Sequence, residues 1–121
     1  MTENGKKYDL EDRTYEFARD VRAFIKLLLR TLANIEDMKQ LVRASGSVGA
    51  NYIEANEALS KKDFGMRIKI CRKEAKECRL WLRLLDTGNN PAVETERVRL
   101  VQEARELQHI FGAIVTKTSD D

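Results

Sequence analysis

The residues with the most potential for chemistry are one histidine, two cysteines and several carboxylates at helical spacing. Glu106 and His109 form the Glu-x-x-His motif that di-iron helical bundles carry on two of their helices. His109 is the only histidine, so the motif cannot occur a second time. Helical phase also places the pair opposite Leu107 and Phe111, which predicts a solvent-facing position. We therefore expect no di-iron centre.

The two cysteines, Cys71 and Cys78, lie seven residues apart, or about 10.5 Å along one helix. A disulfide needs Cα atoms within about 7 Å, so these thiols cannot bridge each other. Two cysteines and one histidine do not form a tetrahedral zinc set either. We expect buried thiols in a reducing compartment, and neither a metal nor a cofactor.

Hydroxyl and phosphate chemistry finds no support in the glycine-rich stretch 44–51. Ser45 and Ser47 lie there without a Gly-x-Ser-x-Gly elbow. Gly46 to Gly49 lacks the Gly-Lys-Ser/Thr of a phosphate loop and the strand that precedes a dinucleotide fingerprint. The sequence therefore predicts a protein that is not an enzyme.

The composition is typical of a helical protein. Of the 121 residues, 42% are hydrophobic and 35% charged, with one proline and six glycines. The longest aliphatic run is 27–29, far short of the roughly 20 residues that span a bilayer. The stretch 1–7 is polar and lacks the apolar core of a secretory signal. We expect a cytoplasmic protein that does not contact the membrane.

Helix caps and apolar spacing predict four helices in a single domain, 1–121. The expected spans are about 10–32, 35–58, 61–87 and 91–116, with a frayed tail after about Thr116. The residues expected to start or end these helices are Asp9, Asn34, Ser60, Gly88, Asn90 and Pro91. Because every predicted connection is short, we expect an all-α, antiparallel up-down-up-down four-helix bundle.

Apolar residues recur at steps of three and four and predict the buried face of each helix. The predicted core positions include Leu10, Phe17, Val21, Phe24, Leu28 and Leu32, then Met38, Leu41, Val42, Ser45, Val48, Gly49 and Tyr52. They continue with Phe64, Ile68, Cys71, Ala75, Cys78, Leu82 and Leu85, then Val93, Leu100, Ala104, Leu107, Phe111 and Ile114. Two glycines within one turn of the second helix cost about 1 kcal/mol each and indicate close backbone packing.

The third helix carries a second apolar stripe, away from its predicted core face. This stripe consists of Met66, Ile70, Trp81 and Leu84. One interpretation is that it only widens the buried face, or that Trp81 covers a loop. We favour self-association, because contiguous exposed apolar patches usually mark interaction sites. The small residues of the second helix would also admit a close neighbour, which adds Ala44 and Asn51 to the predicted oligomer interface.

Positive charge concentrates in the same helix. Between residues 60 and 87, nine Lys or Arg face four acidic residues, whereas 34–58 holds two against four. Six of these cations fall within about 120° of arc and define the basic ridge: Lys69, Arg72, Lys73, Lys76, Arg79 and Arg83. Such a ridge is the electrostatic pattern of a phosphate-binding surface. The alternative is a solvated face partly neutralised by acids on the neighbouring helix. No aromatic residue interrupts the ridge, so backbone contact should dominate over base stacking.

Several stretches of the sequence together form a recognisable pattern: 8–11 with 17–18, 41–51 with 54–55, 74–82 and 103–107. The most specific of them is Arg43-Ala44-Ser45-Gly46-Ser47-Val48-Gly49-Ala50-Asn51, an uncommon sequence for a helix interior. In these stretches the chain resembles the small four-helix-bundle proteins encoded by intervening sequences of bacterial 23S ribosomal RNA genes.

The resemblance implies a bundle that assembles as a homopentameric ring. It also implies kinship with the accessory variability determinant of diversity-generating retroelements, a relative that binds nucleic acid and a reverse transcriptase. It supplies no catalytic residues. Two hypotheses follow. In the first, an oligomer binds nucleic acid, with RNA favoured over DNA, through the basic ridge. In the second, the bundle is a protein-interaction scaffold, for example for a reverse transcriptase, without nucleic-acid affinity of its own.

Overall fold

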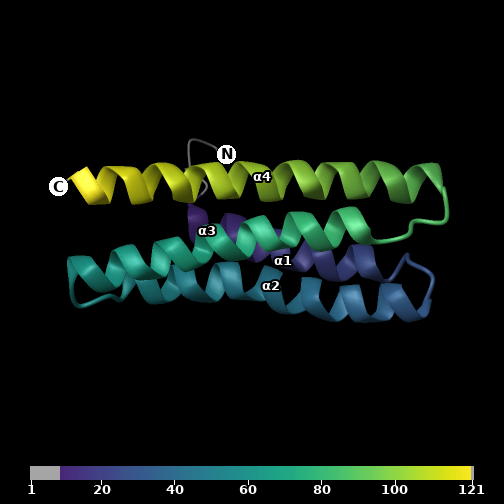
Figure 1. The fold of residues 1–121 in the computed structure, drawn as a ribbon, viewed down its shortest axis with the longest axis horizontal. Helices are drawn as coiled ribbons and strands as arrows, with labels where there is room; N and C mark the ends of the chain where they lie inside the picture. The colour runs from purple at the N-terminus through teal and green to yellow at the C-terminus, as the bar shows by residue number, and fades with distance from the viewer. Residues whose placement is uncertain (1–8, 121) are drawn as a thin grey trace.

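The computed structural model describes residues 9–120, which form four α-helices and no strand. The helices are α1 (Leu10–Ile25), α2 (Leu32–Asn56), α3 (Lys61–Leu84) and α4 (Pro91–Asp120). The connections 26–31, 57–60 and 85–90 are short, so each helix runs antiparallel to the one before it (Figure 1). The predicted all-α class with four helices is confirmed. None of the helices in this part of the chain is long and apolar enough to cross a membrane.

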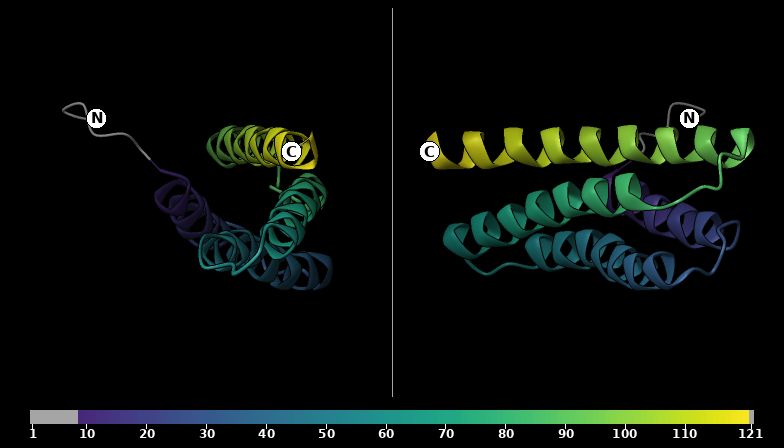
Figure 2. Two further views of the ribbon diagram at one scale, coloured as in Figure 1. Left: turned by 90° about the vertical axis from the view of Figure 1, so that its left-hand side faces the viewer. Right: turned by 45° about the vertical axis from the view of Figure 1, so that its right-hand side comes forward.

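Each helix packs against two neighbours. The packed pairs are α1–α2, α2–α3, α3–α4 and α4–α1, whereas the backbones of the diagonal pairs, α1 with α3 and α2 with α4, lie farther apart. The end-on view shows this arrangement, with α1 and α3 on opposite sides (Figure 2). α1 is the shortest helix, and α4 continues past the start of α1 to pack beside the first turns of α3 (Figure 1).

Three helix starts lie where the sequence predicts them. The Asp9 carboxylate accepts from the Asp12 amide at 2.8 Å, and Ser60 Oγ accepts from the Asp63 amide at 3.0 Å. Asn90 Oδ1 accepts from the Ala92 amide at 3.0 Å, which starts α4. Each cap satisfies amides that no helical carbonyl can reach.

The predicted boundary between the first two helices is wrong. α1 ends at Ile25 rather than Leu32, and Thr31, not Asn34, caps α2 by accepting from the Asn34 amide at 3.1 Å. Leu32, predicted to lie in the core, is 82% exposed in the first turn of α2. The physical reason is that Asn34 lies inside α2 with its side chain buried. It forms hydrogen bonds with Leu29 in the α1–α2 connection and with Asp86 in the α3–α4 connection, so it does not cap the helix.

Three further helix ends differ from the prediction. α2 ends at Asn56 rather than at about 58. α3 ends at Leu84 rather than at 87, and Gly88 follows in a left-handed conformation with a φ of 65°. α4 extends to Asp120, beyond the expected end at 116.

The glycines of α2 allow α1 to pack closely within the same chain. A Cβ at Gly49 would lie 3.2 Å from Thr14 Oγ1, and one at Gly46 would lie 3.4 Å from an Arg22 guanidinium nitrogen. α2 continues unbroken through both positions, as expected. Ala44, assigned from sequence to the oligomer interface, is instead fully buried in the core. The small residues of α2 therefore pack against α1 of the same chain, at Gly46 and Gly49.

Candidate nucleic-acid interface

The basic ridge occupies a face of α3 beside the buried face, on the side toward α4. Lys69, Arg72, Lys73, Lys76 and Arg83 are exposed, and Arg79 is half-buried. The buried face of the helix carries Ile68, Cys71, Ala75, Cys78 and Leu82. Lys69 and Arg83 are 14 residues apart, which corresponds to about 21 Å of helix, so the cations form a long, straight row.

On the α4 side, the ridge meets neutral groups. Arg79 donates to Gln108 Oε1 at 2.7 Å, and Arg72 lies over Gly112, where a Cβ would be 3.7 Å from its Cδ. Neither neighbour carries a charge. The absence of a side chain at Gly112 leaves room for the aliphatic stem of Arg72 on α4. Arg79 is held by this contact, whereas the other ridge cations donate no hydrogen bond to another described residue.

On the α2 side, the acids of α3 are already paired. Arg43 lies 3.4 Å from the buried Glu74 carboxylate and 3.3 Å from Glu77. The hydrogen bond and charge of Glu74 raise the pKa of Arg43 above its usual value. Among the described residues, no ion pair neutralises Lys69, Arg72, Lys73, Lys76 or Arg83. The alternative of a ridge neutralised by acids on the neighbouring helix finds no support in these contacts.

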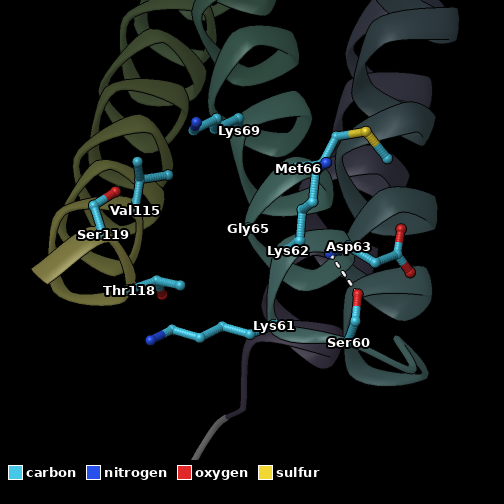
Figure 3. A pocket seen from close by; sticks show the side chains of 10 residues that line it. All are labelled: Ser60, Lys61, Lys62, Asp63, Gly65, Met66, Lys69, Val115, Thr118 and Ser119. Atoms are coloured by element: carbon cyan, nitrogen blue, oxygen red, sulfur yellow. Dashed lines mark hydrogen bonds between the residues drawn. The ribbon is translucent and has the colours of Figure 1, made fainter. Parts of the chain in front are cut away.

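The structure extends the ridge to the start of α3, which the sequence interpretation missed. Lys61, Lys62 and Lys69 line a hollow of about 820 Å³ between α3 and the end of α4 (Figure 3). Lys61 and Lys69 reach from α3 toward α4, on which Val115 and Ser119 form the opposite wall. A signal was present in the sequence: Lys62, Lys69, Lys76 and Arg83 recur every seven residues.

At the other end of the ridge, α4 adds its own cations. Arg83, Arg97 and Arg105 line a second hollow of about 490 Å³. Arg97 is paired with Glu94 and donates to the Arg83 carbonyl at 3.0 Å. Arg105 is exposed and makes no ion pair with another described residue. Arg105 was not predicted from the sequence, because the predicted ridge contained residues of α3 alone.

The predicted oligomer-interface residues separate into two groups. Met66 and Leu84 are about half exposed, at 50% and 54%, and Leu80 beside them is 47% exposed. Ile70 is partly buried. Trp81 packs against the core, and its indole N–H is buried without a partner among the described residues.

The second group consists of Asn51 and Ala44, whose side chains contact other residues of the same chain. The side-chain amide of Asn51 donates to Ser47 at 3.0 Å and accepts from Arg67 of α3 at 3.1 Å. Asn51 therefore joins α2 to α3, and Ala44 lies in the core. Met66, Leu80 and Leu84 lie on one face of α3, with Met66 about 21 Å along the helix from Leu80, and the structure does not bring Ala44 and Asn51 to that surface.

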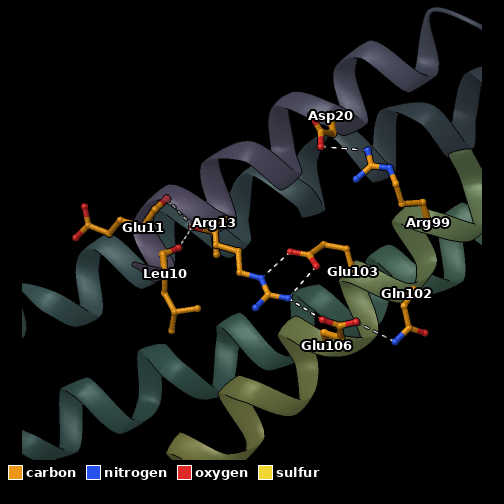
Figure 4. A network of polar contacts seen from close by, with 9 residues as sticks. Leu10, Glu11, Arg13, Asp20, Arg99, Gln102, Glu103 and Glu106 are labelled. Atoms are coloured by element: carbon orange, nitrogen blue, oxygen red, sulfur yellow. Dashed lines mark hydrogen bonds and ion pairs between the residues drawn. The ribbon is translucent and has the colours of Figure 1, made fainter. Parts of the chain in front are cut away.

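The Glu-x-x-His pair lies away from the core. His109 is exposed, and Glu106 binds Arg13 of α1 at 2.9 Å and Gln102 at 3.1 Å (Figure 4). These hydrogen bonds lower the pKa of Glu106. Across residues 9–120, no three potential metal ligands gather at one place.

The amino-acid sequence of this helical bundle matches one protein family over most of its length. The model of the 23S rRNA-intervening sequence proteins matches residues 6–113. The chain belongs to this family. The resemblance inferred from the glycine-containing stretch of α2 is confirmed.

A solved structure of similar fold supports the assignment. It is a protein of unknown function from the S23 ribosomal protein family of Bacteroides thetaiotaomicron VPI-5482. The two chains superpose with a TM-score of 0.76 at 28% identity, covering 88% of this chain and 98% of the other. No curated protein matches the chain.

Proposed function

We propose that this protein is a non-enzymatic, cytoplasmic nucleic-acid-binding bundle that contacts the phosphate backbone, preferentially of RNA, through the basic ridge. The observation that carries this proposal is a row of exposed cations on α3 without paired acids among the described residues. Their positive potential attracts phosphates, and binding releases the counterions condensed on the nucleic acid.

The form of the ridge favours a structured nucleic acid. The row is straight because its residues recur on one helix face, and the hollows at its two ends add Lys61, Lys62 and Arg105. No aromatic side chain lies among the ridge residues, so bases are not stacked there. Contacts from Lys and Arg to phosphates position a protein on a duplex without reading its sequence.

The experiment that tests this function combines charge reversal with a salt titration. Lys69→Glu, Lys73→Glu and Lys76→Glu together remove three exposed cations that form no ion pair with another described residue. We expect affinity for structured RNA to fall, and the log–log salt slope to lessen by about 3 for three lost phosphate contacts. The control carries Lys→Arg at the same positions and should bind as the parent does. Equal binding by the Glu and Arg variants would refute the role of the ridge.

We further propose that the chain assembles as a homopentameric ring. The resemblance implies this state, and the exposed apolar side chains Met66, Leu80 and Leu84 on α3 support a contact between copies. Repetition of the ridge around a ring would raise its avidity for a long phosphate backbone. The same surface supports the second candidate function, a scaffold for a protein partner such as a reverse transcriptase.

Light scattering distinguishes these states. A ring gives about five times the chain mass of 13.9 kDa, and Leu84→Glu should shift it toward the monomer. Leu84 is a better probe than Trp81, because replacing Trp81 would also disturb the core. A monomer at micromolar concentration would refute the ring. A stable oligomer without nucleic-acid affinity would favour the scaffold.

A further inference from the structure

α1 carries a second row of cations, on the side of the bundle opposite α3. Arg19, Arg22 and Lys26 follow one another at steps of three and four residues, and Arg30 follows in the connection. All four are exposed. Tyr15 stands one turn before Arg19 and is 63% exposed, with the Arg19 guanidinium 5.7 Å from its ring centroid. We call these five residues the α1 stripe.

Most cations of the α1 stripe form no close ion pair with another described residue, so they can bind an external anion. Arg22 donates to two neutral acceptors, the Ala18 carbonyl at 2.9 Å and Ser45 Oγ at 3.4 Å. The nearest carboxylate to Arg19 is that of Asp20, at 3.9 Å, and Asp20 also binds Arg99 of α4. Lys26 and Arg30 form no ion pair with any other described residue.

The stripe leads to a hollow of about 500 Å³ between α1 and α2. The floor of this hollow is apolar and its rim is basic. The floor residues are Ile25, Ile35, Met38 and Val42, and the rim residues are Lys26, Arg30, Lys39 and Arg43. Gly46 lies one turn beyond Val42, and its missing side chain leaves room for the Arg22 guanidinium on α2. An exposed aromatic ring, a line of cations and an apolar hollow thus follow one another along one face of α1.

We propose that the α1 stripe binds single-stranded nucleic acid, with phosphates on the cations and an unpaired base stacked on Tyr15. Aromatic platforms beside a basic groove are how proteins hold single strands, because a single-stranded base can offer its π-face, whereas a base inside a duplex is stacked between its neighbours. The basic ridge on α3 has no such ring. The proposal therefore goes beyond the function of the ridge, since it assigns a different surface and a different form of nucleic acid.

The length of the stripe suits a short single-stranded segment. Tyr15 and Lys26 are eleven residues apart, which corresponds to about 16 Å along α1. That distance accommodates a few nucleotides, with the hollow next to Lys26 available to a second base. Because α1 and α3 lie diagonally across the bundle and do not pack as neighbours, variants of one surface leave the other in place (Figure 2).

The test compares Tyr15→Ala with Tyr15→Phe by fluorescence anisotropy. The probes are a labelled ten-nucleotide single-stranded RNA and an abasic strand of the same length. We expect Tyr15→Ala to weaken binding of the RNA by roughly 5- to 100-fold, and Tyr15→Phe to bind like the parent because its ring still stacks. The abasic strand should bind both variants equally. Arg22→Gln with Lys26→Gln should reduce the salt slope for the single strand by about 1.4.

The failure of this proposal can be told apart from failure of the ridge. A duplex probe reports the ridge, so Tyr15→Ala should leave duplex affinity unchanged, whereas Lys69→Glu, Lys73→Glu and Lys76→Glu should lower it. Melting curves followed by circular dichroism establish that each variant is folded. Unchanged single-strand affinity in Tyr15→Ala would overturn the proposal, and so would equal affinity of the parent for the RNA and the abasic strand.

Discussion

The side-chain amide of Asn34 makes two hydrogen bonds with the backbone of Asp86, which lies 52 residues later in the chain. Asn34 Nδ2 donates to the Asp86 carbonyl, and the Asp86 amide donates to Asn34 Oδ1, each at 2.9 Å. Nδ2 also donates to the Leu29 carbonyl at 2.9 Å. The side chain is 1% exposed. The Asn34 amide therefore links the α1–α2 connection to the α3–α4 connection, at the same end of the bundle.

Asn34→Ala should destabilise the protein by about 1–3 kcal/mol, because it removes three hydrogen bonds to partly buried backbone groups of Leu29 and Asp86. Asn34→Asp is the matched control, with the same shape. It can still accept from the Asp86 amide, but it cannot donate to either carbonyl. Urea unfolding followed by circular dichroism measures both variants. A loss below about 0.5 kcal/mol in Asn34→Ala would show that the two connections are held by other contacts.

Substitution of the two α2 glycines by alanine should have different effects. Gly46→Ala meets only the mobile end of Arg22 and should gain up to about 1 kcal/mol from helix propensity. Gly49→Ala places its methyl group 3.2 Å from Oγ1 of Thr14, which is buried and bonded to the Leu10 carbonyl at 2.8 Å. Crowding should cancel the gain there. Denaturation midpoints test this order, which would be contradicted by equal stabilisation at both positions.

The two thiols should be unreactive while the protein is folded. Burial raises the pKa of Cys71 to about 12, and burial with the charge of Glu74 raises that of Cys78 further. The thiolate, which is the reactive form, is therefore suppressed. A disulfide reagent at pH 8 should modify both cysteines only at the rate of unfolding. Prompt modification of either thiol in the native protein would mean that its surroundings open readily.

The same pKa shifts predict a loss of stability in alkali. A thiol whose folded pKa is raised stabilises the fold fully below its unfolded pKa of about 8.5, and this contribution is lost as pH rises toward the folded value. Unfolding free energy should thus fall between about pH 8.5 and 12. The slope should be shallower in Cys71→Ala with Cys78→Ala, by up to about 1.4 kcal/mol per pH unit for each thiol removed. Parallel slopes for the two proteins would contradict this.

The seam between α1 and α4 should depend on Arg13. Its guanidinium binds Glu103 with two hydrogen bonds, at 2.7 and 2.9 Å, and these bonds raise the pKa of Arg13 (Figure 4). Both side chains are about one quarter exposed, so a double-mutant cycle of Arg13→Met and Glu103→Gln should give a coupling of about 0.5–1 kcal/mol. High salt should reduce it. A coupling of zero at low salt would show that the Arg13–Glu103 pair does not stabilise this seam.

Acid should weaken the same seam. The hydrogen bonds from Gln102 and Arg13 lower the pKa of Glu106, so its stabilising contribution is present above the ordinary carboxyl pKa. That contribution is lost as pH falls through the lower folded value. The protection of α1 amides against hydrogen exchange, taken relative to the intrinsic exchange rate at each pH, should therefore fall toward low pH more in the parent than in Glu106→Gln. Identical pH dependence in both proteins would refute a role for this carboxylate.

The sequence predicts the helices better than it predicts their ends. Apolar spacing is a repeated signal, so residues such as Phe17, Ile68 and Leu107 are buried as expected. A cap depends on one side chain, and Thr31 and Asn34 both have side chains suited to it. Thr31 is the cap because the Asn34 side chain is bonded to Asp86 instead, and no local sequence pattern reveals this long-range contact.

The candidate surface was predictable only within one helix. Helical phase gathers the ridge cations on α3, but it carries no information on which residues of α4 lie alongside. Arg105 and Gln108 enter the surface through packing between helices. Two small or polar residues of α2, Ala44 and Asn51, were likewise predicted from the sequence to lie at an oligomer interface, whereas the structure shows that α1 lies against Gly49 and that Ala44 is in the core.

The measurement that tests the central claim most directly is a salt titration of binding to labelled structured RNA and duplex DNA, by fluorescence anisotropy, on nuclease-treated protein. The account predicts binding that weakens linearly in a log–log plot, with a slope that corresponds to several phosphate contacts and with RNA bound more tightly. Absence of binding at about 50 mM salt, where such contacts are strong, would contradict it and would leave the scaffold as the better account of this bundle.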